Sequence, residues 1–270
     1  MKHSFLTILL CATSLCTQAQ DTLRTGKIIT NAQMVGIGTV NQLDTYLSPE
    51  EYKGLELRYL SHTIRENGTK FSRELVHQSH LAYTKNRADN NQEIGGAYNF
   101  QYNVLYELGK WDTSQGSLKV KAGGGIDANL GFLYNLRNGN NPAQGYANLN
   151  LAPTIAANYE FRLWNRPFQI TYEAQVPLVG VMFSPQFGQS YYELFAKGNY
   201  DHNIVLTTIG CAPSMRQMLT FDCTLHHTTL RFGYLGDYQQ AKINGLKYHT
   251  WSNLFMIGIV RKFSITKIIP

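Results

Sequence analysis

The sequence of 270 residues contains little charge and, beyond its N-terminus, no long apolar run. Charged residues make up 16% of it, against about 25% in an ordinary soluble domain. No stretch of 18 or more apolar residues follows the N-terminal segment, which excludes membrane-spanning helices. Aromatic residues are plentiful at 12%, with 17 Tyr and 13 Phe. Something other than charge must therefore cover the outside of the protein.

Cysteine is also scarce, and two of the four cysteines lie in the N-terminal segment. The other two, Cys211 and Cys223, would be roughly 40 Å apart on one extended strand, which is too far for a disulfide. They are predicted to be free thiols, and a disulfide-dense scaffold is excluded.

The N-terminus has the pattern of an export signal. A short basic start is followed by an apolar stretch and then by small Ala19. This order predicts a signal peptide over residues 1–19 and an exported domain over residues 20–270. A buried first helix is the alternative interpretation.

Polar and apolar residues alternate with period 2 over long stretches of the exported domain. Tyr98, Phe100 and Tyr102, for example, alternate with Asn99 and Gln101. The same division runs through residues 117–134, 146–163 and 168–182. Alternation predicts strands with one buried face.

The length of these stretches favours a membrane over a soluble sandwich. Ordinary strands have about 5–6 residues, whereas these exceed ten, which is enough to cross a bilayer when tilted at about 45°. A sheet in hydrocarbon must close into a barrel, because no backbone group can stay unpaired there. Aromatic residues near the strand ends also favour an outer-membrane barrel.

Ten strands are predicted, at residues 31–42, 54–65, 70–84, 92–108, 116–135, 145–164, 167–183, 203–225, 228–240 and 246–263. The expected fold is all-β, a single antiparallel up-and-down transmembrane β-barrel of about ten strands. Twelve are possible, since Pro213 interrupts the eighth. Short turns are predicted at 67–69, 109–116, 165–166 and 226–227, and longer loops at 43–53, 85–91, 136–145, 184–202 and 240–245.

The last strand carries a further signal. Its apolar face consists of Trp251, Phe255, Ile257, Ile259 and Phe263. This pattern resembles the C-terminal signal that the barrel assembly machinery recognises, although Arg261 shares the face and must snorkel to the interface. The expected location is the outer membrane, with lipids and the assembly machinery as partners.

The inward face is predicted to carry a mixed polar network of Glu56, Arg58, His62, Glu107, Lys119, Lys121, Asp127, Glu160, Arg162, Glu173, Arg216, Asp222, Arg231 and Asp237. A ten-stranded lumen is narrow, so these groups are expected to meet as hydrogen-bonded ion pairs that hold the barrel shut. A narrow polar path or a ligand pocket is the functional alternative.

The outer loops offer two further hypotheses. Outer-membrane proteases of the omptin type use Asp and His above the rim, so a loop-based hydrolase would require Asp89, Asp201 and His202 to converge. A phospholipase-type site would need a lipid-facing Ser and His, for which only His77 is a candidate.

The aromatic residues Tyr191, Tyr192 and Phe195 on the longest loop form an expected outer-loop patch. They either fold over the mouth as a lid, which we favour, or bind a partner.

Other motifs predict no chemistry. His226 and His227 lack a third ligand nearby and are interpreted as turn residues rather than as a metal site. The run Gly123–Gly125 precedes no helix and is not a phosphate loop. Basic residues are spread along the strands, which disfavours nucleic acid. No catalytic residue, cofactor or metal is predicted.

Four segments resemble an uncharacterised family of exported proteins from Bacteroides-type bacteria. They are residues 43–54 (LDTYLSPEEYKG), 134–144 (YNLRNGNNPAQ), 176–195 (VPLVGVMFSPQFGQSYYELF) and 214–222 (SMRQMLTFD). The resemblance implies an outer-membrane or periplasmic β protein and carries over no activity. A soluble periplasmic barrel that binds an apolar ligand is the rival; it would place the aliphatic face inside.

Overall fold

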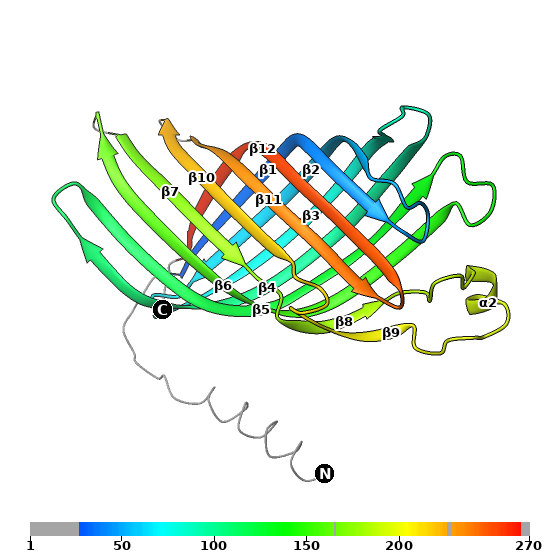
Figure 1. Cartoon of the computed structure of the whole chain (residues 1–270). Coiled ribbons are helices and arrows are strands. Elements are labelled where there is room, and N and C mark those ends of the chain that lie inside the picture. The colour runs from blue at the N-terminus through cyan, green and yellow to red at the C-terminus, as the bar shows by residue number, and fades with distance from the viewer. Residues whose placement is uncertain (1–26, 165, 226–227, 266–270) are drawn as a thin grey trace, which may run out of the picture.

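A computed structural model describes residues 27–164, 166–225 and 228–265, most of which are in β-strands (Figure 1). The strands are β1 (Lys27–Asp44), β2 (Tyr52–Glu66), β3 (Phe71–Asn86), β4 (Gln92–Asp112), β5 (Gly116–Asn135), β6 (Ala143–Leu163), β7 (Arg166–Gln175), β8 (Val179–Phe183), β9 (Ile204–Thr208), β10 (Met215–Leu225), β11 (Thr228–Ile243) and β12 (Leu246–Ile265). One short helix, α2 (Tyr191–Phe195), lies between β8 and β9. Within the described residues, no helix is long and apolar enough to cross a membrane. The predicted signal peptide and the His226–His227 turn lie outside the described residues.

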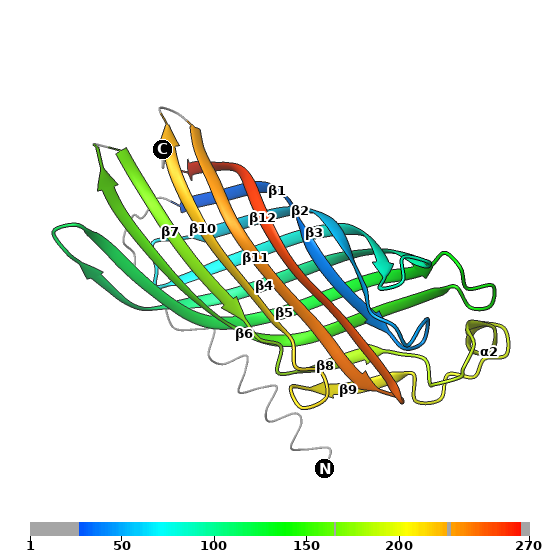
Figure 2. The same cartoon turned by 45° about the horizontal axis from the view of Figure 1, so that its top comes forward.

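Ten strands close into an antiparallel barrel. The order β5-β4-β3-β2-β1-β12-β11-β10-β7-β6 returns to its start through the pairing of β5 with β6. The first and last strands, β1 and β12, pair along their whole common length, from Lys27 with Ile265 to Asp44 with Tyr248 (Figure 2). The predicted ten-stranded barrel is thus confirmed, with β8 and β9 as two extra strands.

The two extra strands arise because two predicted strands are interrupted. The predicted strand 167–183 is split into β7 and β8 around Pro177, and 203–225 is split into β9 and β10 by a turn that contains Pro213. Of these two interruptions, the sequence predicts only the one at Pro213. Both breaks lie at the same place in the wall, so the barrel keeps ten strands.

Hydrogen bonds on either side of Pro177 explain why the breaks coincide. Val176 N–H donates to Pro153 O at 3.1 Å, and Leu178 N–H donates to Leu151 O at 3.0 Å. Neighbouring residues of a strand direct their N–H groups to opposite sides. The N–H that Pro177 lacks would therefore point away from β6, toward the segment between β9 and β10. There the chain turns away, and the β8–β9 hairpin continues the ladder of β6 alone.

The two ends of the barrel differ. One end, called here the short-turn end, is where β2, β4, β6, β10 and β12 end and where β1, β3, β5, β7 and β11 begin. The opposite long-loop end carries α2, which lies beyond β8 and β9 (Figure 1). The predicted turn 109–116 is shorter than expected because a β-bulge between Glu107 and Gly109 lets β4 continue to Asp112. The predicted loop 240–245 is a two-residue turn at Asn244–Gly245, both with positive φ.

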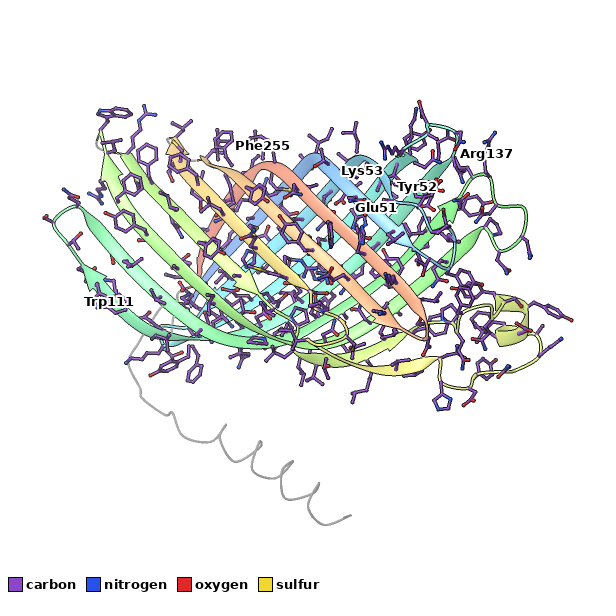
Figure 3. All side chains as sticks on the ribbon, viewed as in Figure 1. Glu51, Tyr52, Lys53, Trp111, Arg137 and Phe255 are labelled. Carbon is purple, nitrogen blue, oxygen red and sulfur yellow. The ribbon has the colours of Figure 1, made fainter. Side chains whose placement is uncertain are left out.

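The alternating faces lie as the outer-membrane interpretation requires. Leu57, Leu130 and Phe255 point outward and are 59%, 65% and 59% exposed. Phe255 stands on the outer side of the wall and Trp111 lies near the short-turn end (Figure 3). Polar side chains point inward along the same strands. The soluble alternative, which needs the aliphatic face inside, is therefore wrong for these strands.

The interior also contains apolar layers. One, the apolar collar, consists of Met34, Leu60, Val76, Met218, Leu235, Leu254 and Met256. A second cluster near the long-loop end consists of Leu47, Leu133, Tyr146, Met182, Ala241 and Ile243. The lumen is thus filled by alternating polar and apolar layers.

Candidate functional site

The centre of the lumen holds an ion-pair network around two arginines. Arg58 of β2 donates from Nε to Glu56 Oε1 at 2.6 Å and from Nη1 to Asp237 Oδ2 at 2.6 Å. Its Nη1 also donates to Gln78 Oε1 at 3.1 Å. Asp237 lies on β11, three strand positions away around the wall, so the contact crosses the lumen. Residues far apart in the sequence are therefore tied together inside the barrel.

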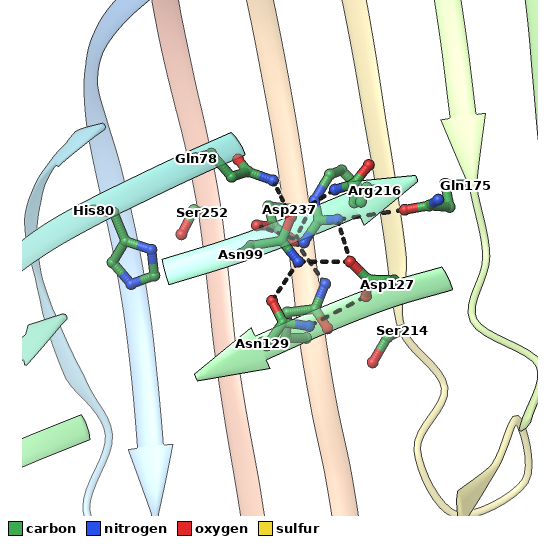
Figure 4. A network of polar contacts seen from close by, with 12 residues as sticks. Gln78, His80, Asn99, Asp127, Asn129, Gln175, Ser214, Arg216, Asp237 and Ser252 are labelled. Atoms are coloured by element: carbon green, nitrogen blue, oxygen red, sulfur yellow. Dashed lines mark hydrogen bonds and ion pairs between the residues drawn. The ribbon is translucent and has the colours of Figure 1, made fainter. Parts of the chain in front are cut away.

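Arg216 of β10 extends this network to the opposite wall. Its Nη1 donates to Asp127 Oδ1 on β5 at 3.1 Å, and its Nε lies 3.3 Å from Asp237 Oδ1. Asn99 and Asn129 donate to the two oxygens of Asp127 at 2.5 and 3.1 Å (Figure 4). We call Glu56, Arg58, Asp127, Arg216 and Asp237 the central network.

Each carboxylate of the central network has a donor on both oxygens. Glu56 Oε2 accepts from the Ser252 hydroxyl at 2.5 Å, and Asp237 Oδ1 accepts from Gln239 Nε2 at 2.7 Å. Buried charges are tolerated when they are paired and hydrogen-bonded in this way. The cavity that Arg58 and Asp237 line is only about 20 Å³, so the side chains fill this part of the lumen.

A second polar group lies on the other side of the apolar collar. Along β2 the successive inward residues are Arg58, Leu60 and His62, so the collar separates His62 from the central network. His62 Nε2 is 3.7 Å from Glu74 Oε2, and one ligand atom from each of His62, Glu74 and Glu173 lies within 4.8 Å of the others. We call His62, Glu74 and Glu173 the vestibule cluster.

Beyond the vestibule cluster, the short-turn end opens into a cavity of about 460 Å³, the vestibule. Lys121 Nζ pairs with Glu66 Oε1 at 2.6 Å near this end. Lys119 Nζ lies 4.0 Å from Glu66 and 3.9 Å from Glu107. These charges are partly solvated, unlike those of the central network.

The outer loops bring together two of the three residues of the hydrolase hypothesis. Asp201 and His202 do meet, at 2.6 Å between Oδ1 and Nδ1, because they lie in an exposed turn where His202 has a φ of 54°. Asp89 instead pairs with Lys85 at 2.8 Å. No hydrogen bond or ion pair among the described residues joins Asp89 to the other two. His77, on the outward face of β3, contacts Tyr98 through Nδ1 at 2.5 Å rather than a serine.

The outer-loop aromatic residues divide into one that packs and two that do not. Tyr191 donates to Gln144 Oε1 at 2.6 Å and accepts from Gly145 N–H at 2.7 Å. Burial raises the pKa of Tyr191 to about 12, so the hydroxyl stays protonated. Tyr192 and Phe195 are 67% and 66% exposed. A lid that buries its aromatics is therefore wrong for these two residues.

Comparison with known proteins places the sequence in a family. Residues 4–268 match the family described as proteins of unknown function, DUF3316. The chain belongs to this family. The Bacteroides-type source stays a prediction. No curated protein matches the sequence.

Solved structures similar to this DUF3316 chain are outer-membrane proteins. The outer membrane protease OmpT from Escherichia coli is 8% identical, with 92% of this chain and 100% of that chain covered and a TM-score of 0.45. OprG from Pseudomonas aeruginosa is 9% identical over 89% and 97%, with a TM-score of 0.34. Ail from Yersinia pestis is 9% identical over 88% and 99%, with a TM-score of 0.30. At these values the likeness says nothing about activity.

The predicted lumen residues differ in how far they are buried. The buried ones are Glu56, Arg58, His62, Lys121, Asp127, Glu173, Arg216, Asp222, Arg231 and Asp237. Glu107 and Lys119 are half-buried, and Glu160 and Arg162 are exposed where they line the vestibule. Arg231 binds Asp222 through two hydrogen bonds of 2.6 and 2.7 Å.

Sequence reasoning missed two parts of the interior. Asn99 was predicted on a polar face but not as a member of the network, and Gln78, which donates to Asn99, was not predicted at all. Near the long-loop end, Asn135 donates to Tyr52 and to buried Glu93, both at 3.1 Å. The signal was available, because Glu93 and Asn99 lie on the same face of one alternating strand.

Proposed function

We propose that this DUF3316 protein is a sealed outer-membrane barrel with a structural role, closed by the central network and the apolar collar. The observation that carries this proposal is the filled lumen: paired charges cross it, and an apolar layer lies directly beneath them. An ion that crossed would have to break the pairs and then lose its water in the collar.

The outward apolar belt supports the membrane assignment. Large apolar side chains are exposed on strands all around the barrel, which water would not favour. Short turns belong on the periplasmic side of such barrels and longer loops outside, so the short-turn end faces the periplasm. The β12 strand ending near Phe263 is the proposed contact with the assembly machinery, and lipids are the main partner.

Two tests address location and closure separately. Cell fractionation, with gel mobility compared before and after boiling, should recover the protein in the outer membrane with a heat-dependent shift. Soluble recovery without a shift would contradict the membrane assignment. Purified protein in planar bilayers should give no steady conductance, and discrete current steps would contradict the sealed lumen.

We also propose that the protein is not an enzyme and does not bind nucleic acid. The separation of Asp89 from the Asp201–His202 pair supports the first statement. Measuring proteolysis of peptide libraries by the purified barrel tests it. A cleavage lost on His202→Ala would overturn it.

A further inference from the structure

The vestibule cluster has buried polar atoms without partners. His62 and Glu74 are each 3% exposed. Three atoms have no hydrogen-bond partner among the described residues: the two ring nitrogens of His62 and Glu74 Oε2. Such atoms cost about 1–3 kcal/mol each when nothing satisfies them. A group that binds here would recover that cost.

Lysines and Arg231 line the cavity beside the cluster, but within the part of the chain that the structure describes none of them forms an ion pair with Glu74 or Glu173. Glu74 and Glu173 are both buried carboxylates on opposite walls, from β3 and β7. Arg231 lines the same cavity but is held by both oxygens of Asp222. Lys121 is engaged with Glu66 at 2.6 Å. A positive ion would therefore be favoured between the two carboxylates.

The donor set suits a divalent transition metal. One imidazole and two carboxylates match the ligands of zinc, which bind at about 2.0–2.2 Å. Two atoms bound tetrahedrally to one such ion lie about 3.3 Å apart. The His62–Glu74 separation of 3.7 Å is too long for a hydrogen bond and close to that spacing.

The cluster also has a route to solution. It lines a cavity of about 110 Å³, and this cavity shares Ser117, Glu160, Gln169 and Lys262 with the vestibule. An ion could enter from the short-turn end without crossing the collar. Room for water as a fourth ligand is present in the same cavity.

We propose that His62, Glu74 and Glu173 form a binding site for one divalent transition-metal ion, for which Zn²⁺ is the best match. The ion would link β2, β3 and β7 across the lumen beneath the apolar collar. The site does not depend on whether the barrel conducts, so it stands or falls separately from the sealed-barrel proposal.

The test is a metal titration of the intact barrel, stripped with EDTA and kept in detergent. Calorimetry with Zn²⁺ should give one ion per chain, and Co²⁺ should give the visible absorption of a four- or five-coordinate site. His62→Gln and Glu173→Gln should each weaken binding by more than about 100-fold, beyond the effect expected for outer-shell partners. Both substitutions keep the side-chain size, and heat-dependent gel mobility checks that each variant is folded.

Three control variants remove other histidines. His77→Gln alters a lipid-facing histidine of β3, His202→Ala alters the exposed loop pair, and a double His226→Ala, His227→Ala variant alters the predicted turn. All three should bind Zn²⁺ as the unmodified protein does. Absence of binding to the unmodified protein would overturn the proposal. So would a loss caused by any control variant and not by Glu173→Gln.

Discussion

The central network and the vestibule cluster lie on either side of one apolar layer and use similar residues, yet they differ in how their atoms are satisfied. In the central network both oxygens of Glu56, Asp127 and Asp237 accept a hydrogen bond. In the vestibule cluster, the described residues supply no partner to His62 or to one oxygen of Glu74. In the central network only Arg216 Nε lacks a hydrogen bond among the described residues, and it lies 3.3 Å from Asp237 Oδ1. The vestibule cluster has three such atoms, so it is the more open of the two to a ligand.

Access follows the same division. The lumen cavity that Arg58 and Asp237 line is about 20 Å³, and apolar layers lie on both sides of the central network. The vestibule cluster borders a cavity of about 110 Å³ that continues toward solution. The barrel therefore combines a filled middle with a short-turn end that is open to solution.

Removing one charge from the central network should have the largest effect. Asp237→Asn leaves Arg58 and Arg216 without the carboxylate they share, so we expect a loss of about 3–5 kcal/mol in the free energy of unfolding. Denaturant unfolding in detergent, followed by tryptophan fluorescence, measures it. Asp89→Asn, in an exposed pair with Lys85, is the matched control and should not shift the unfolding midpoint. Equal midpoints for the two variants would mean that the network does not hold the barrel together.

Opening the apolar collar should come next. Leu60→Ala removes a side chain that is 2% exposed and should cost about 2–5 kcal/mol, depending on how far the collar relaxes. It should also raise ion leak through planar bilayers, because the layer below the network is thinned. Leu57→Ala on the same strand faces outward and should leave the leak unchanged. A leak as low in Leu60→Ala as in the unmodified barrel would assign closure to the central network alone.

A charge removed from the vestibule cluster should act in the opposite direction from Asp237→Asn. In metal-free protein, Glu173→Gln relieves repulsion with Glu74, and we expect a gain of about 1 kcal/mol in the free energy of unfolding. With Zn²⁺ present, the unmodified barrel should gain stability as the ion concentration rises above its dissociation constant, whereas the variant should not. Destabilisation of the metal-free variant would show that Glu173 is already paired.

The sequence could predict which way each wall residue faces, but not which inward residues meet. Alternation in β7 places Glu173 inside and Tyr172 outside, and the structure agrees. Arg58 and Asp237 are 179 positions apart, and their contact depends on how the strands are staggered when the barrel closes. The two-residue period determines which face of the sheet a residue lies on, but it does not determine the stagger between strands.

The interrupted strands show a second reason for partial success. Pro213 marked one break from the sequence, but Pro177 passed as part of a strand because alternation continues on both sides of it. A proline is compatible with a strand wherever the N–H that it lacks would have no hydrogen-bond acceptor. Only the pairing with β6 shows that Pro177 lies at such a position. The meeting of His62 with Glu173 could not be predicted for a related reason, since the two residues approach each other from across the lumen.

The smallest expected effect concerns the carboxylate of Glu193, which is hydrogen-bonded within α2 and not inside the barrel. Glu193 accepts hydrogen bonds from the backbone N–H and the hydroxyl of Ser190 in the first turn of α2, and these lower the pKa of Glu193 below its ordinary value of 4.5. A carboxyl with a lowered folded-state pKa contributes its full stabilisation above the ordinary value and loses it as the pH falls through the folded value. Hydrogen exchange of the α2 amides should therefore stay slow near pH 6 and quicken, relative to unstructured peptide, below about pH 4.5, while exchange in β12 stays unchanged. Glu193→Gln should remove most of this pH dependence, because its amide can still accept from Ser190 but does not titrate. If α2 loosened equally in both proteins on acidification, the change would arise in the barrel beneath it.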